Sequence, residues 1–141
     1  MKRYIIAAAA LILTAAVPAL AQTGRAMNPA QAIAATAAAG SGTVEGVFEM
    51  HVASVGESGF NVYLNSSADY RDAANLSVEL HPGALAELKA RLGGEARELL
   101  AGKHIRIKGV ARRVPIPRRD GTSYHQTRID VDLASQIEIV G

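Results

Sequence analysis

Apolar and polar residues alternate along most of the chain after residue 42, a pattern typical of strands with one buried and one solvated face. In residues 43–55 the apolar Val44, Phe48 and Met50 share one parity, and polar side chains share the other. Phe60 begins a second such run, so Phe48 and Phe60 are both expected in the core. The alternation predicts further strands around residues 60–65, 76–80, 103–109 and 127–131, with a short terminal strand at 137–139.

The period changes to that of a helix after the third predicted strand. Leu85, Leu88 and Leu92 follow the i, i+3, i+7 spacing of one helix face, and Gly93 suits the end of that helix. A second helical turn is expected over residues 95–100. The predicted order is therefore three strands, a helix, and two further strands.

This order favours a mainly β fold, a five-stranded Greek-key OB barrel with one helix between strands 3 and 4. A small β-sandwich is the alternative, but it does not explain a helix at that one place. Residues 43–141 form the predicted domain, a normal size for a single hydrophobic core.

Several short runs carry a resemblance to a known family. They are Leu64-Asn65 with Tyr70-Arg71, Leu99-Leu100-Ala101-Gly102-Lys103, Ile105-Arg106-Ile107-Lys108-Gly109 and Ser135-Gln136-Ile137-Glu138-Ile139. Over about residues 43–140 the chain resembles exported bacterial single-domain OB-fold proteins, which are similar to nucleic-acid-binding OB-fold domains. The chain departs from that pattern after Asn65, where it lacks an aromatic residue that would add a stacking ring.

The first 21 residues have the pattern of a signal peptide. Lys2 and Arg3 precede an apolar run at residues 5–17, and Ala19-Leu20-Ala21 has the small-x-small form that signal peptidase cleaves. We expect cleavage after Ala21, no stable membrane span after cleavage, and a periplasmic or secreted product. An uncleaved membrane anchor is the alternative, although the apolar run is short for a bilayer. The chain has no Cys, which excludes a lipid-modified cysteine and disulfides.

Residues 22–42 form an Ala-rich segment between the signal and the domain. Asn28 and Pro29 suit the start of a helix that Gly40 would end. Short isolated helices are marginally stable in water, so a flexible spacer is the alternative.

Basic residues are concentrated in one stretch. The chain has 15 Lys and Arg against 13 Asp and Glu, but Lys2 and Arg3 leave with the signal, so the mature chain is formally neutral. Residues 22–102 carry a net charge of −4, residues 103–119 carry +7 and residues 120–141 carry −3. A neutral protein with one basic ribbon attracts anions locally rather than through a global field.

The basic stretch is expected to leave the strand after Gly109 and form a hairpin loop that closes at Asp120-Gly121. OB barrels bind ligands on the face of strands 2 and 3, framed by the loops that follow strands 1 and 4. Guanidinium groups bind phosphate and aromatic rings stack on bases, so we expect single-stranded nucleic acid or another anionic polymer as ligand. The candidate ligand-binding residues are Tyr63, Arg106, Lys108, Arg112, Arg113, Arg118, Arg119 and Tyr124.

Two other interpretations remain open at this point. The basic ribbon can instead meet an envelope protein partner, or it can be a solvated edge that Pro115 and Pro117 protect from strand pairing.

No catalytic residue, cofactor or metal site is predicted, because the four His are scattered and no nucleophile motif is present. A metal-dependent nuclease is a weaker alternative, with Asp69, Asp72 and Asp130 as carboxylates and Arg71 and Arg112 as phosphate ligands.

Overall fold

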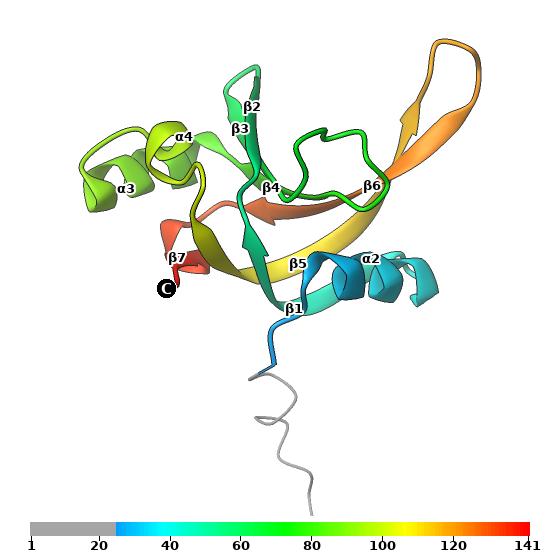
Figure 1. Cartoon of the computed structure of the whole chain (residues 1–141), viewed down its shortest axis with the longest axis horizontal. Helices are drawn as coiled ribbons and strands as arrows, with labels where there is room; N and C mark the ends of the chain where they lie inside the picture. The colour runs from blue at the N-terminus through cyan, green and yellow to red at the C-terminus, as the bar shows by residue number, and fades with distance from the viewer. Residues whose placement is uncertain (1–24) are drawn as a thin grey trace, which may run out of the picture.

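A computed structural model describes residues 25–141 of the chain (Figure 1). The predicted signal peptide, residues 1–21, and its cleavage site after Ala21 lie outside the described residues. Among the described helices, none combines the length and the apolar character needed to cross a membrane.

Residues 25–141 are mainly β, as predicted, with seven strands in one sheet and a few helices. The hydrogen-bonded order is β1-β5-β6-β4-β3-β2, with β7 paired to β5 off this path. All neighbours are antiparallel except β4 and β6, which run parallel. The strands are β1 (Thr43–His51), β2 (Ser54–Ser58), β3 (Asn61–Asn65), β4 (Leu76–Leu80), β5 (His104–Pro117), β6 (Ser123–Val131) and β7 (Ile137–Ile139).

The first predicted strand is divided into two strands that have different neighbours. β1 pairs with β5, whereas β2 pairs with β3, so the two strands lie at opposite ends of the hydrogen-bonded path. Only Val52 and Ala53 separate them. The Val52 N–H donates to the Lys103 carbonyl, next to β5, and the Ala53 N–H donates to the Asn65 carbonyl of β3. The chain therefore passes from β5 to β3 between these two residues.

The basic strand is longer than predicted, and the prediction of a loop directly after Gly109 was wrong. β5 runs to Pro117 and pairs with β6 over its last seven residues. Pairing with β1 ends at Arg112, and the Arg113 N–H donates to Gly42 on that same side. Pro115 and Pro117 follow Arg113 at every second position, so their ring nitrogens point to the same side as the Arg113 N–H. Beyond Arg113 that side of β5 has no neighbouring strand among residues 25–141, and the missing N–H groups therefore cost no hydrogen bond in the sheet.

The core lies on one face of this sheet and includes most of the side chains that the alternation assigned to it. Phe48, Leu64 and Ile129 are fully buried, but Phe60 is 88% exposed. The prediction of a buried Phe60 was wrong because Phe60 lies in the turn before β3, where the strand alternation does not apply.

The predicted helix between the third and fourth strands is present as α3 (Pro82–Leu92), followed by the short α4 (Ala96–Leu99). Leu88 is buried in the core, and Leu85 and Leu92 pack against it. Gly93 ends α3 with a φ of 76°, a left-handed conformation that glycine adopts at little cost. A 3-10 turn, η1 (Ala134–Gln136), precedes β7.

The Ala-rich segment contains a helix, α2 (Pro29–Ala38), which is one of the two alternatives above. Asn28 and Gln31 form a reciprocal capping box at its N-terminus. Ala32 and Thr36 are buried where α2 packs on the sheet beside β1 and β5, and Met27 bridges to Phe48. In Figure 1, α2 lies below β5, while the β2–β3 and β5–β6 hairpins both project from the opposite side.

Contact between α2 and the sheet can be tested with one pair of substitutions. Ala32→Glu places a carboxylate in a fully buried position, so we expect the free energy of unfolding to fall by about 2 kcal/mol or more. Ala34→Glu is the control, because Ala34 is exposed on the same helix, and its effect should stay within about 0.5 kcal/mol. Urea unfolding followed by circular dichroism measures both, and equal effects would contradict this packing.

Candidate functional site

A polar surface covers the side of β3, β4 and β6 that faces away from the core, and we call it the polar face. Strand register builds it, because Tyr63 lies opposite Glu79 and Ser77 lies opposite Arg128. A pocket of about 340 Å³ opens on this face. Its lining residues are Gly56, Glu57, Ser58, Tyr63, Asn65, Tyr70, Ser77, Gln126 and Arg128.

Loop 66–75 is held over the polar face by one buried side chain. Asn75 is 3% exposed and donates to Ser77 Oγ at 2.9 Å and to the Tyr70 carbonyl at 3.3 Å. Its own Oδ1 accepts from the Ser67 N–H at 3.0 Å, and Ser77 Oγ donates onward to Asn65 Oδ1 at 2.7 Å. Because buried amides need their partners, this network determines where the loop and Tyr70 lie.

An arginine lies over the ring of each of three tyrosines around the polar face. The guanidinium carbon of Arg128 is 5.6 Å from the centre of the Tyr63 ring, a separation at which a cation and a ring attract each other. The equivalent distances are 4.8 Å for Arg118 over Tyr124 and 5.7 Å for Arg71 over Tyr70.

Gln126 connects two of these pairs by hydrogen bonds. Its Nε2 donates to Tyr124 Oη at 3.2 Å, and its Oε1 accepts from Arg128 Nη2 at 2.8 Å. The pairs therefore form a continuous track of rings and guanidinium groups from the pocket toward the β5–β6 hairpin.

Two carboxylates lie beneath this track, at the level of β4 and β6. Glu79 Oε1 accepts from Tyr63 Oη at 2.9 Å, and the pKa of Tyr63 is raised by burial and by this hydrogen bond. Asp130 forms a two-point ion pair with Arg112, with Nε to Oδ2 at 2.6 Å and Nη2 to Oδ1 at 3.1 Å. Burial raises the pKa of Asp130, but the hydrogen bonds from Arg112 and His81 outweigh it and bring the pKa to about 2.

The eight residues predicted from sequence divide into two groups. Tyr63, Arg112, Arg118 and Tyr124 belong to the polar face or to the track beside it. Arg112 is nevertheless held by Asp130, with Glu79 Oε2 only 3.6 Å from its Nη2, so much of its charge is already compensated.

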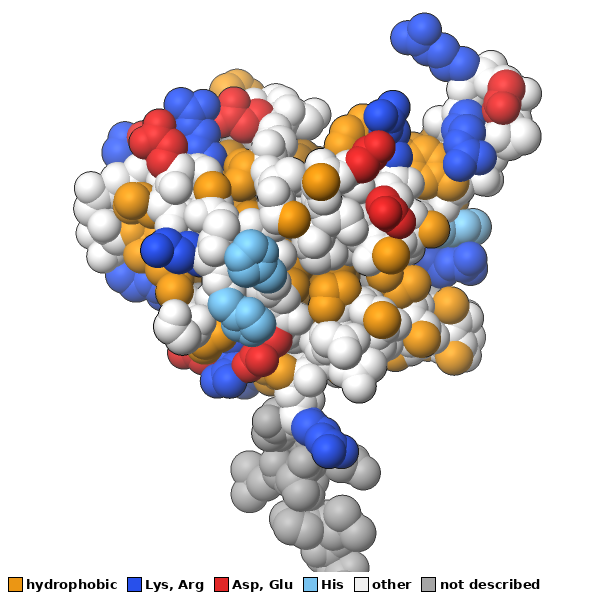
Figure 2. Space-filling model, in the orientation of Figure 1, with side chains coloured by type: hydrophobic (Ala, Val, Ile, Leu, Met, Phe, Trp, Pro, Cys, Tyr) orange, Lys and Arg blue, Asp and Glu red, His pale blue; other side chains and the backbone are white. Residues whose placement is uncertain are grey.

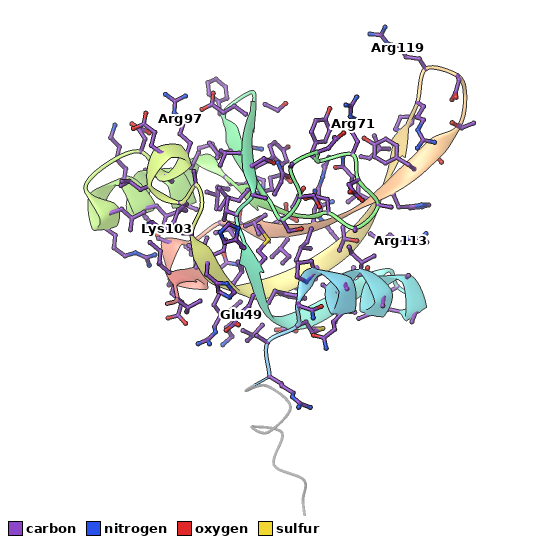
Figure 3. The ribbon with its side chains drawn as sticks, in the orientation of Figure 1. Glu49, Arg71, Arg97, Lys103, Arg113 and Arg119 are labelled. Atoms are coloured by element: carbon purple, nitrogen blue, oxygen red, sulfur yellow. The ribbon has the colours of Figure 1, made fainter. Side chains whose placement is uncertain are left out.

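The other four predicted residues are not brought together with the track. Arg106 forms ion pairs with Glu49 and Glu138 where β5 meets β1 and β7, and this lowers the pKa of Glu49. Lys108 pairs with Val47 of β1 on the same stretch. Arg113 lies beside α2 and Arg119 extends from the tip of the β5–β6 hairpin (Figure 3). The basic ribbon is therefore distributed around the molecule, and Figure 2 shows basic and acidic side chains interspersed on one face.

Arg128 and Gln126 are central to the polar face, but sequence reasoning did not select them. The candidate arginines and lysine were chosen by local charge density, and both of these residues lie outside the basic stretch at residues 103–119. The alternation of Arg128 with Ile129 did place it on the polar side of a strand. Only the parallel pairing of β6 with β4 brings it to Tyr63.

The carboxylates named for the nuclease alternative are engaged in separate places in the described part of the chain. Asp69 binds Arg71 within loop 66–75, and Asp72 accepts from the Ala74 N–H in the same loop. Asp130 instead neighbours Glu79 and His81. His51 and His104, which are far apart in sequence, lie directly opposite each other on β1 and β5.

No protein-family model and no curated protein matches the chain. Among solved structures it is similar to an OBody bound to hen egg-white lysozyme, with 23% identity, 69% of this chain and 81% of that chain covered, and a TM-score of 0.44. It is also similar to the aspartyl tRNA synthetase from Entamoeba histolytica, with 16% identity, 70% of this chain and 18% of that chain covered, and a TM-score of 0.42.

The role of Asn75 in holding loop 66–75 can be tested by Asn75→Ala. The substitution removes the shared partner of Ser67, Ser77 and the Tyr70 carbonyl, so we expect a loss of about 1–3 kcal/mol in the free energy of unfolding. Amide hydrogen exchange should rise in residues 66–74. Asn61→Ala is the control, since Asn61 binds Glu79 on the same face but does not contact this loop network. Unchanged exchange in the loop of the Asn75 variant would disprove the role.

Proposed function

We propose that this protein is an exported OB-fold domain that binds single-stranded nucleic acid across the polar face. The observation that carries the proposal is the set of three arginine–tyrosine pairs around a pocket on that face, two of which Gln126 joins into the track. Unpaired bases stack on aromatic rings, and the adjacent guanidinium groups bind phosphate. A track that alternates the two groups suits a ligand that alternates bases and phosphates.

The strand arrangement supports the OB-fold part of this proposal. β1 and β2 are nearly continuous in the chain, yet one pairs with β5 and the other with β3, as expected of one strongly bent strand that closes a barrel. The parallel pairing of β4 with β6 and the helix α3 between β4 and β5 agree with the same topology. In that topology the polar face is the usual ligand face.

The charges on the polar face support an anionic ligand. Arg118 and Arg128 have no carboxylate within ion-pair distance among residues 25–141, and their hydrogen bonds go to Thr122 and Gln126. Both therefore keep charge available for a ligand, unlike Arg112 and Arg106. Under this proposal, the signal-peptide pattern of residues 1–21 would direct the protein across the inner membrane, and the protein would bind nucleic acid or another anionic polymer there.

An envelope protein partner is the second candidate, and one observation favours it. Phe60 is 88% exposed at the tip of the β2–β3 hairpin, and exposed aromatic side chains commonly anchor protein interfaces. Figure 1 places this hairpin on the same side of the molecule as the β5–β6 hairpin, so a protein partner could also meet the track.

The nucleic-acid proposal is tested by fluorescence anisotropy with labelled single-stranded oligonucleotides at two salt concentrations. Tyr124→Ala removes one stacking ring, so we expect binding to weaken by about 1–3 kcal/mol.

Arg128→Gln should weaken binding and reduce the steepness of its salt dependence, since one phosphate contact is lost. Arg106→Gln is the matched control, because Arg106 lies in the same basic stretch of the sequence but is held by two glutamates away from the face.

The outcomes separate the candidates. If polyphosphate of equal charge competes as well as the oligonucleotide and Tyr124→Ala has no effect, the ligand is an anionic polymer recognised by charge alone. If no oligonucleotide binds even at low salt, the nucleic-acid proposal fails. A protein partner that is retained by the unaltered protein and lost with Phe60→Ala would then support the second candidate.

A further inference from the structure

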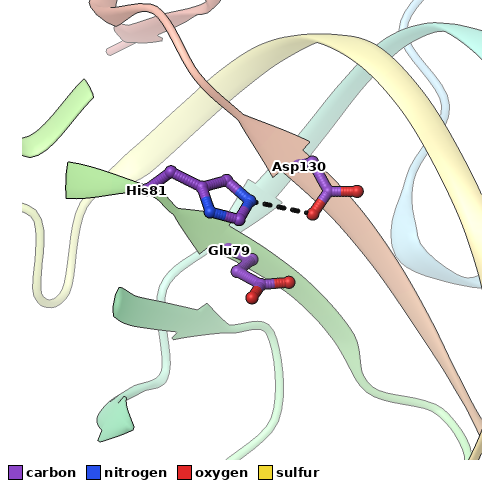
Figure 4. A group of neighbouring side chains, drawn as sticks. All are labelled: Glu79, His81 and Asp130. Atoms are coloured by element: carbon purple, nitrogen blue, oxygen red, sulfur yellow. Dashed lines mark hydrogen bonds and ion pairs between the residues drawn. The ribbon is translucent and has the colours of Figure 1, made fainter. Parts of the chain in front are cut away.

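Three potential metal ligands lie together at the inner end of the polar face. Glu79 and His81 come from the end of β4 and the residue after it, and Asp130 comes from β6 (Figure 4). Their ligand atoms all lie within 4.8 Å of one another. β4 and β6 are neighbours in parallel pairing, and Glu79 lies opposite Asp130. The sheet therefore brings together potential ligands that are far apart in the sequence.

One oxygen in this group has no hydrogen-bond donor. Glu79 is 7% exposed, and its Oε1 accepts from both Asn61 and Tyr63, but its Oε2 is buried and unpartnered. The nearest cation to Oε2 is Arg112, whose Nη2 is 3.6 Å away, beyond hydrogen-bond distance. That same Nη2 is 3.1 Å from Asp130 Oδ1, so one guanidinium group lies near both carboxylates and hydrogen-bonds to only one of them.

The charges of the group are also incompletely balanced. Two carboxylates face one guanidinium, which leaves one negative charge when the imidazole is neutral, the form in which histidine binds metals. A buried carboxylate without full compensation is costly, so the group is suited to accept a positive charge.

We propose that Glu79, His81 and Asp130 bind a divalent transition-metal ion, for which Zn²⁺ is the best match. Zinc accepts imidazole nitrogen and carboxylate oxygen at about 2.0–2.2 Å, commonly with three protein ligands and one water. The 3.1 Å between His81 Nε2 and Asp130 Oδ1 suits two neighbouring ligands of one ion. Arg112 Nε keeps its contact with Asp130 Oδ2 and orients that ligand, as outer partners do around metal sites.

The ion would tie the end of β4 to β6 and would hold Tyr63 through Glu79. This proposal does not depend on nucleic-acid binding, because it rests on the unpartnered Glu79 oxygen and is measured with the metal alone. The competing explanation is a proton shared between Glu79 and Asp130, which also relieves the unpartnered oxygen.

The test is isothermal titration of the purified protein with ZnCl₂, combined with thermal unfolding in the presence and absence of the metal. We expect one equivalent to bind and the melting temperature to rise, since an ion that binds only the folded state stabilises it. His81→Gln should lower the affinity by at least about tenfold. MgCl₂ should give no comparable effect, because the nitrogen ligand favours zinc.

His104→Gln is the matched control, and it should leave zinc binding unchanged. His104 lies opposite His51 and its Nε2 is 3.6 Å from Glu49, so it belongs to the other group of histidine and carboxylate side chains on the sheet. Circular dichroism checks that each variant is folded. If His81→Gln does not fold, the shift of the His81 ring resonances on adding zinc to the unaltered protein gives the same information.

Two results would overturn the proposal. Absence of zinc binding would leave the shared proton as the explanation for Glu79. Binding that is abolished by His104→Gln and kept by His81→Gln, or zinc-induced shifts at His104 with none at His81, would assign the metal to the exposed histidine pair.

Discussion

The structure depends on the burial of β4 on both of its faces. Leu76, Val78 and Leu80 pack into the core, as the alternation requires, but Ser77 and Glu79 on the other face are buried as well. A buried hydroxyl and a buried carboxylate need partners, since leaving either unsatisfied costs free energy comparable to a lost hydrogen bond or more. The neighbours that supply these partners form the polar face.

Each buried polar residue of β4 organises a different part of that face. Ser77 is joined to Asn65 and Asn75, which hold loop 66–75 in place. Glu79 receives Asn61 and Tyr63 from β3 and faces Arg112 and Asp130 on the other side. The orientation of Tyr63, and with it the pocket, is thus a consequence of satisfying one buried carboxylate.

Ion pairing decides which of the many basic residues retain charge for a ligand. Arg106 and Arg112 lie in the most basic stretch of the chain, but carboxylates from other strands compensate them. Arg118 and Arg128 instead bind neutral side chains and tyrosine rings. Charge density along the sequence therefore selected Arg118, which keeps its charge, together with Arg106 and Arg112, which do not, because the compensating acids come from distant segments.

Local pattern by itself determined the mainly β character, the positions of most strands and the helix α3. These follow from side-chain periods of two and about 3.6 residues and from glycine at the turns, which act within a few residues. It failed at Phe60, where a turn interrupts the alternation, and after Gly109, where β5 continues because β6 pairs with it. The grouping of Glu79, His81 and Asp130 and the pairing of Arg128 with Tyr63 were decided only by tertiary structure. His81 and Asp130 are 49 positions apart, and Arg128 reaches Tyr63 only across β4, so no local period could bring them together.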